Sequence, residues 1–173
     1  MTRIILKYIM MFILLVLAQA VVFNNLCLYN VAFPLVFIYF ILRLPITLGI
    51  NWVMTFSFLI GLTVDIFSDT QGVNALCCTL LSVVRKPTLG LYLSRDDEMS
   101  GTEPSIKSLG LVVYMKYLIT LVLFYCILYF LIESFSLFNP LRMLTRIVAS
   151  TLLTFFLILA IDSLTLRRHA KRL

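Results

Sequence analysis

The sequence predicts an all-α integral membrane protein, a compact bundle of six transmembrane helices that forms one membrane domain over residues 1–173. Hydrophobic residues make up 62% of the chain and charged residues only 13%, against about 25% charged residues in typical soluble domains. The apolar residues are gathered into runs, and the basic residues stand mostly at the ends of these runs. A soluble fold of this size has too much surface to hide so much apolar side chain, so lipid is the expected surrounding.

The first apolar run covers residues 8–23 and follows a basic start with Arg3 and Lys7. With slight extension it reaches the length of about 20 residues that a helix needs to cross the bilayer. The run could instead be a secretory signal, because Ala18-Gln19-Ala20 has the small-x-small form of a cleavage site. Its continuation to Phe23 favours a retained membrane helix.

The next three predicted spans differ in length. Residues 32–44 are short for a span and must be sheltered among longer helices, and Pro34 and Pro45 are expected to mark helix ends there. Residues 50–67 form a full-length third span. After a polar turn, residues 73–84 form a fourth span that is again short.

The second half of the chain begins with its one long hydrophilic segment, residues 85–109, which we expect to be a cytoplasmic loop. Residues 110–132 and 144–166 form the fifth and sixth spans. A basic tail follows the last span.

The basic residues predict that both termini lie in the cytoplasm. When the N-terminus is placed inside and the spans alternate, only Arg142 and Arg146 fall outside, and Lys116 falls within a span. This bias is the positive-inside pattern, so topology explains the net charge of +6 without a nucleic-acid partner. The basic residues on the cytoplasmic side are Arg3, Lys7, Arg43, Arg85, Lys86, Arg95, Lys107, Arg167, Arg168, Lys171 and Arg172.

Charged side chains inside the predicted spans are candidates for function, since each is unfavourable in hydrocarbon by about 2.5–3.5 kcal/mol. Lys116 and Asp162 lie at similar depth in two antiparallel helices, so we expect them to form an intramembrane ion pair or to share a nearby partner such as Arg43. Asp65 and Asp69 lie near the outer end of the third span. One interpretation is packing and topology, and the other is a transport path for ions or protons.

The spacing Gly61-x-x-x-Asp65-x-x-x-Asp69 matches half of the motif by which CDP-alcohol phosphotransferases hold metal ions. The other half, an Asp-Gly followed by Ala-Arg, is missing just upstream. The one histidine, His169, lies in the basic tail, and the sequence contains neither a His-Glu-x-x-His pair nor a Gly-x-Ser-x-Gly turn. We therefore expect no enzyme activity, no cofactor and no metal site.

A series of short motifs, together with six spans and basic ends, is similar to the MreD family of rod shape-determining proteins. The likeness is clearest over residues 19–85, and the second half matches mainly in hydropathy. The motifs are Gln19-x-x-x-Phe23-Asn24, Pro34, Tyr39-Phe40-Ile41-Leu42-x-Leu44-Pro45, Gly61-Leu62-x-x-Asp65-Ile66-Phe67-x-Asp69-Thr70-x-Gly72-x-Asn74-Ala75 and Arg85.

The resemblance implies a non-catalytic scaffold of the bacterial cell-wall elongation (Rod) complex in the inner membrane. Its implied partners are MreC, the glycosyltransferase RodA, a class B penicillin-binding transpeptidase, the MreB filament and membrane lipids. It also implies a fold like the S-components of energy-coupling-factor transporters. The candidate structural or partner-contact residues are Asn24, Pro34, Pro45, Gly61, Asp65, Asp69, Thr70, Gly72 and Asn74.

The alternative function is the substrate-binding membrane subunit of a small-molecule transporter. Transporter S-components typically carry an Ala-x-x-x-Ala stripe on the first helix, where their energising partner docks. Ala18 and Ala20 have the wrong spacing for that stripe. A cavity that is open to the outside and lined by polar groups would favour the transporter, and a closed or filled interior would favour the scaffold.

Overall fold

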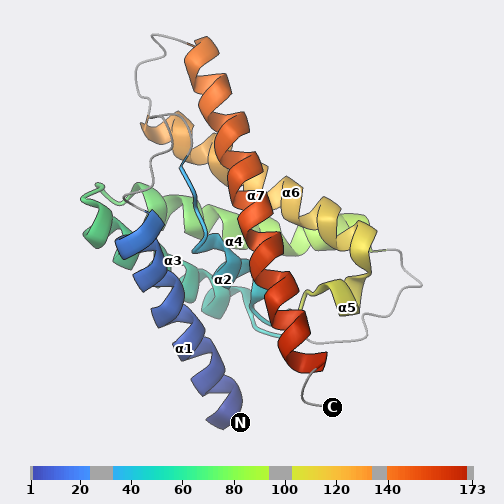
Figure 1. Cartoon of the computed structure of the whole chain (residues 1–173). Helices are drawn as coiled ribbons and strands as arrows, with labels where there is room; N and C mark the ends of the chain where they lie inside the picture. The colour runs from blue at the N-terminus through green and yellow to red at the C-terminus, as the bar shows by residue number, and fades with distance from the viewer. Residues whose placement is uncertain (1, 24–32, 94–102, 134–139, 171–173) are drawn as a thin grey trace.

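The computed structural model describes residues 2–23, 33–93, 103–133 and 140–170 (Figure 1). These residues form helices and connecting turns, and none of them lies in a β-strand. The elements in chain order are α1 (Thr2–Ala18), the π-helical segment η1 (Gln19–Phe23), α2 (Ile38–Arg43), α3 (Ile50–Ser68), α4 (Val73–Tyr92), α5 (Ile106–Leu109), α6 (Leu111–Glu133) and α7 (Pro140–Ala170).

Three of the described helices are long and apolar enough to cross a membrane, namely α3, α6 and the Met143–Leu164 part of α7. The apolar stretch Leu6–Val21 is shorter. About a third of each long span is buried inside the protein, so the remaining apolar surface faces outward. This is the distribution expected of helices that lie in lipid.

The helices pack as a series of neighbours in the order α3, α4, α6 and α7. A tight turn joins α3 to α4, and α4 lies against α6. Helix α6 packs against α7, which crosses in front of α4 and α6 in Figure 1. The start of α1 and the end of α7 lie toward the same end of the molecule.

The structure differs from the predicted span over residues 32–44. Only Ile38–Arg43 is helical, and residues 33–35 before it have no regular secondary structure. Residues 34–42 are all buried. We call residues 33–44 the interior segment, because it lies within the bundle as a broken, six-residue helix and not as a helix long enough to span.

Side chains from distant helices satisfy the irregular backbone of the interior segment. The Gln19 amide donates to the Pro34 carbonyl oxygen at 2.9 Å and accepts from the Val36 N–H at 3.1 Å. From α7, Ser150 Oγ accepts from the Phe33 N–H at 3.0 Å, and Thr154 Oγ1 accepts from the Leu35 N–H at 3.1 Å. Non-helical backbone at membrane depth requires such internal partners, because no water is present to replace them.

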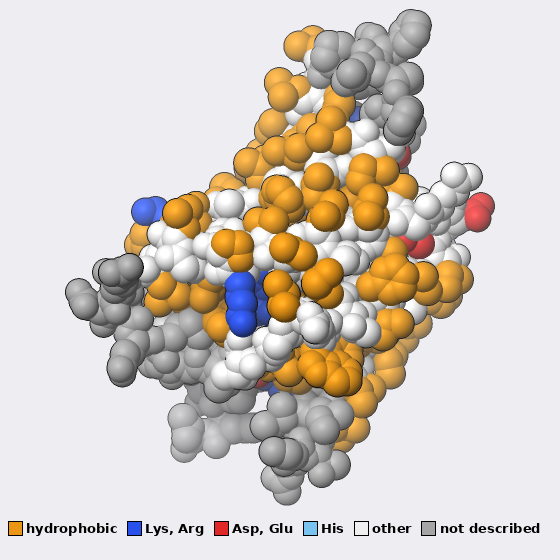
Figure 2. Space-filling model, turned by 180° about the vertical axis from the view of Figure 1, so that it is seen from behind, with side chains coloured by type: hydrophobic (Ala, Val, Ile, Leu, Met, Phe, Trp, Pro, Cys, Tyr) orange, Lys and Arg blue, Asp and Glu red, His pale blue; other side chains and the backbone are white. Residues whose placement is uncertain are grey.

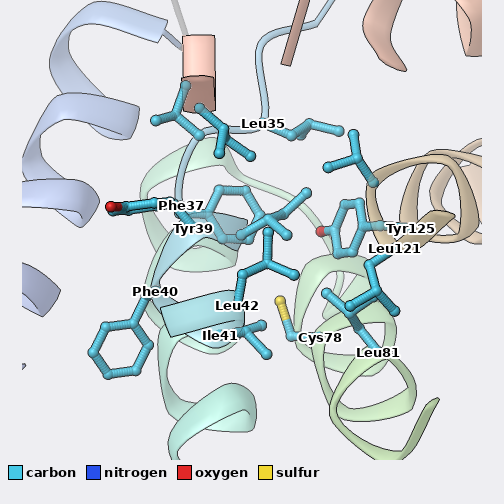
Figure 3. Packing of buried hydrophobic residues seen from close by; sticks show 14 of the residues in the cluster. Leu35, Phe37, Tyr39, Phe40, Ile41, Leu42, Cys78, Leu81, Leu121 and Tyr125 are labelled. Carbon is cyan, nitrogen blue, oxygen red and sulfur yellow. The ribbon is translucent and has the colours of Figure 1, made fainter. Parts of the chain in front are cut away.

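Apolar packing fixes the interior segment against α4 and α6. Figure 3 shows its buried side chains close to those of Cys78 on α4 and Leu121 on α6. The Phe37 ring meets the Tyr125 ring edge-on, with centroids 5.9 Å apart. On the other side, the Phe40 ring meets the Phe12 ring of α1 edge-on. The short helix is therefore held by tertiary contacts, since six residues are too few for a stable isolated helix.

The fourth helix extends beyond the predicted 73–84. Helix α4 continues through Arg85, Lys86 and Pro87 to Tyr92, so the hydrophilic connection begins later than residue 85. Proline has no N–H to donate within a helix, and here the helix continues past it. Arg85 is buried within the bundle and does not lie in a cytoplasmic loop.

Candidate functional site

A buried polar site among the described residues lies in the Asp65 turn, which we define as residues 65–75. Helix α3 ends at Ser68, and Asp69 caps it in the left-handed conformation with φ 53°. Gly72, with φ 78°, begins α4. Glycine adopts this backbone conformation without steric penalty, so the predicted Gly72 permits the close reversal between the two helices.

The Asp65 carboxylate caps the helix that follows its own. Gly72 has no side chain to cap α4. Instead, one Asp65 oxygen accepts from the backbone N–H of Asn74 at 3.0 Å, and the other accepts from that of Ala75 at 2.8 Å. These are the second and third N–H groups of α4, which lack partners within the helix. The positive end of the helix dipole also favours a carboxylate there.

Three more side chains complete the network. Thr70 Oγ1 donates to Asp65, and the Asn74 amide donates to Asp65 at 2.9 Å. On α6, the Tyr125 hydroxyl donates to the Asn74 amide oxygen at 2.7 Å. The network thus ties α3, α4 and α6 together through buried polar groups. Such fully satisfied networks fix one arrangement of helices.

Gly61 brings α3 and α4 into contact beneath this turn. A Cβ at Gly61 would lie 2.5 Å from the Ala75 Cα and 2.6 Å from the Asn74 carbonyl oxygen. Both obstacles are backbone atoms, so only glycine fits. Gly61 and Ala75 therefore serve an internal helix contact, and their small surfaces do not face outward.

The geometry of the turn fits a structural role better than a catalytic one. Asp65 is buried and its oxygens accept four hydrogen bonds, whereas Asp69 is exposed. Among the described residues, no group of three or more His, Cys, Asp or Glu side chains could hold a metal ion.

A second buried polar cluster joins the interior segment to α7. Arg43 donates to Asp162 and, through Nε, to the Tyr39 hydroxyl at 2.8 Å. The Tyr39 hydroxyl donates to the same Asp162 oxygen at 2.9 Å. Asp162 is fully buried, so this pairing offsets the penalty of placing a charge inside the bundle.

The direct Lys116–Asp162 pair is not formed among the described residues; Arg43, predicted as a partner that the two could share, pairs with Asp162. Lys116 is exposed on α6, whereas its neighbours Tyr114 and Tyr117 are buried. Successive residues turn by about 100° around a helix, so Lys116 lies on a different face of α6 from these two tyrosines. A lysine near a helix end can extend its ammonium toward the membrane surface.

The charged cluster continues to α1 through Glu103. Lys7 donates to Glu103 at 2.8 Å, the Tyr8 hydroxyl donates to it at 2.7 Å, and the guanidinium of Arg43 lies 3.9 Å from it. Burial by itself raises the pKa of Glu103, but the hydrogen bonds from Lys7 and Tyr8 outweigh it and lower the pKa. Glu103 therefore fastens the segment before α5 to the first helix as an ionised carboxylate.

Two donors reach the carbonyl groups at the C-terminal end of α2. Arg85 donates to the Leu44 carbonyl, and its Nε donates to the Tyr117 hydroxyl at 3.2 Å. The Tyr117 hydroxyl in turn donates to the Leu42 carbonyl at 3.5 Å. A cation is favourable at a helix C-terminus, which explains why Arg85 is buried next to this one.

The remaining predicted residues take different positions. Pro34 precedes α2 by four residues and offers its carbonyl to Gln19, whereas Pro45 follows α2 and begins the turn into α3. Asn24 lies outside the described residues. Gln19, Tyr39 and Arg85 were noted in the sequence only as motif residues and not as candidate site residues. The site residues Tyr125, Ser150 and Thr154 were not among the candidates at all.

No family model, curated protein or solved structure matches the chain.

Proposed function

We propose that the protein is a non-catalytic scaffold subunit of the bacterial cell-wall elongation complex, of the MreD type, in the inner membrane with both termini in the cytoplasm. In this proposal it binds MreC and positions RodA and a class B penicillin-binding transpeptidase relative to the MreB filament. Its fold is then a six-crossing bundle like the S-components, in which the interior segment and α4 occupy the places of the short spans.

The observation that supports the proposal is that the buried charged side chains bond to other parts of the same protein. Asp65 caps α4, Asp162 pairs with Arg43, and Arg85 caps α2. A transport path or a catalytic centre needs charged groups that face a cavity or a substrate. Here the carboxylates of Asp65 and Asp162 bond to other helices or segments, and Arg85 donates to Leu44 and Tyr117; these bonds support a rigid body that presents surfaces to partners.

The exposed face of α3 is the surface that we assign to a partner helix. Phe58, Leu62 and Ile66 are exposed and recur every four residues, so they form one apolar stripe that leads up to the Asp65 turn. Figure 2 shows hydrophobic side chains over much of the face opposite to that of Figure 1. The single transmembrane helix of MreC would lie along this stripe, and its periplasmic part would meet the turn.

The transporter alternative has one observation in its favour. A shallow depression of about 300 Å³ lies at the Asp65 turn, lined by Leu62, Asp69, Gln71 and neighbouring residues. It lies at the surface, and the most polar group in it, Asp65, is already bonded to α4. A small molecule would find few free donors or acceptors there, so the scaffold is the better-supported function.

Replacement of the native MreD of a rod-shaped bacterium by this chain tests the proposal. We expect rods when the wild-type chain is expressed and round cells when it is depleted. The variant Asp69→Asn should keep rods, because Asp69 is exposed on the same turn, whereas Asp65→Ala should give round cells. Normal rods with Asp65→Ala present at normal abundance would contradict a role for this turn.

A further inference from the structure

A groove lies at the opposite end of α3 from the Asp65 turn, and it is lined by the buried side chain of Arg85, which has N–H groups left to donate. It lies between the turn after α2, the start of α3 and the second half of α4. The lining residues are Pro45, Ile46, Leu48, Ile50, Val53, Ser82, Arg85, Lys86 and Leu89. The groove belongs neither to the Asp65 turn nor to the Arg43 cluster.

Arg85 supplies the charge inside the groove. Its side chain is 5% exposed, and it donates through Nε and Nη2 to Tyr117 and Leu44. Its hydrogen bonds to described residues come from Nε and Nη2 and not from Nη1, and no described carboxylate lies within ion-pair distance of the guanidinium. A buried guanidinium with free N–H groups is a favourable partner for a phosphate or carboxylate.

Two further features add positive potential to the same groove. Lys86 also lines it and is exposed. Helix α3 begins there at Ile50, its cap Gly49 provides no side-chain hydrogen bond, and its first turn contains no acidic residue. The first N–H groups of a 19-residue helix and its dipole therefore favour an anion at this point.

The room in the groove limits the kind of ligand. The enclosed part measures about 20 Å³, which is space for about one water-sized group such as a phosphate oxygen. The walls are largely apolar side chains, Ile46, Leu48 and Leu89 among them. Trp52 in the first turn of α3 is exposed and is next in sequence to the lining residue Val53, and aromatic residues are enriched at membrane interfaces.

We infer that this groove binds the phosphate group of an anionic ligand through Arg85, Lys86 and the start of α3. The apolar walls favour a phospholipid whose headgroup phosphate lies at the groove and whose acyl chains lie along α3 and α4. Inorganic phosphate shares the recognised chemistry, so the experiment separates the two sources. The inference is independent of any protein partner.

The test uses the full chain in nanodiscs and Trp52, the one tryptophan in the sequence, as the reporter. Brominated phosphatidylglycerol should quench Trp52 fluorescence at lower mole fraction than brominated phosphatidylcholine does. In Lys86→Gln the apparent affinity for phosphatidylglycerol should fall about fivefold, the effect of one cation at a membrane surface. Lys116→Gln is the matched control, because Lys116 is an exposed lysine on a different helix.

A parallel arm adds inorganic phosphate to nanodiscs of phosphatidylcholine alone, at constant ionic strength, and follows thermal unfolding. If inorganic phosphate stabilises the wild type and this effect is lost in Lys86→Gln, the free anion is a ligand. If phosphate does not stabilise the protein but phosphatidylglycerol is still preferred, the ligand is the lipid headgroup. The inference is overturned if neither probe responds to Lys86→Gln, or if Lys116→Gln has the same effect. Lys86 is exposed, so its replacement leaves the fold intact and keeps the test decisive.

Discussion

Removal of the Asp65 carboxylate should be among the most destabilising single changes in this protein. In Asp65→Ala, the N–H groups of Asn74 and Ala75 lose the oxygens that lie 3.0 and 2.8 Å away, and both N–H groups are buried. Each hydrogen bond to a charged acceptor contributes about 1.5–3 kcal/mol, so two of them give a loss of about 4 kcal/mol after partial relaxation. Asp65→Asn keeps the shape of the side chain but places its NH₂ group against one of these two backbone N–H groups. It should therefore lower the free energy of unfolding by about 2 kcal/mol.

The assay is equilibrium unfolding in mixed micelles, with helix content followed by circular dichroism as the denaturing detergent is increased. Asp69→Asn is the control, because Asp69 lies on the same turn, carries the same charge and is exposed, and asparagine also adopts the left-handed conformation of this position; its effect should stay within about 0.5 kcal/mol. Hydrogen exchange at Asn74 and Ala75 should also accelerate in Asp65→Ala. Equal stability of Asp65→Ala and Asp69→Asn would refute the capping role of Asp65.

Three further changes test other parts of the structure by the same unfolding measurement. Gly61→Ala should lose about 2–3 kcal/mol because its Cβ would meet the Ala75 backbone, and a neutral result would mean that the helices separate freely. Gln19→Leu should lose about 3 kcal/mol because two buried backbone groups of the interior segment lose their partners; unchanged stability would show that these groups find other partners. Glu103→Gln should lose about 0.5–1 kcal/mol at pH 7. The folded-state pKa of Glu103 is lowered, so its contribution to stability is present above the usual pKa of 4.5 and is lost as the pH falls through the lowered value. The stabilities of wild type and variant should therefore converge in acid. A difference in stability that stays constant with pH would exclude the ion pair.

The long apolar helices were predictable because hydrophobicity and length alone define them. The predicted residues 50–67 and 110–132 correspond to Ile50–Ser68 and Leu111–Glu133, and 144–166 lies within the last helix. In these helices each backbone group bonds within its own segment. The outcome therefore depends little on distant parts of the chain.

The interior segment could not be predicted from its own residues. Residues 32–44 are apolar enough for a span, but the backbone near Pro34 is irregular because Gln19, Ser150 and Thr154 supply its hydrogen bonds. Two of these three side chains come from more than a hundred residues away. No local pattern carries that information.

The predicted end of the fourth helix, residue 84, was too early for a related reason. The sequence Arg85-Lys86-Pro87 has the features of a helix end at the membrane surface, yet the helix continues to Tyr92. Burial of Arg85 is possible because the Leu44 carbonyl and the Tyr117 hydroxyl accept its hydrogen bonds. The Asp65 turn, by contrast, was recognised as a candidate site from its polar residues, although the capping of α4 by Asp65 became visible only in three dimensions.

Purification of the tagged chain from native membranes in a mild detergent, followed by mass spectrometry of what is retained, tests the scaffold function most directly. The account predicts that MreC is recovered in near-stoichiometric amount with the wild type and with Asp69→Asn, and that its recovery falls with Asp65→Ala. Recovery of an ATP-hydrolysing transport module in place of MreC, or equal recovery of MreC with all three proteins, would contradict it.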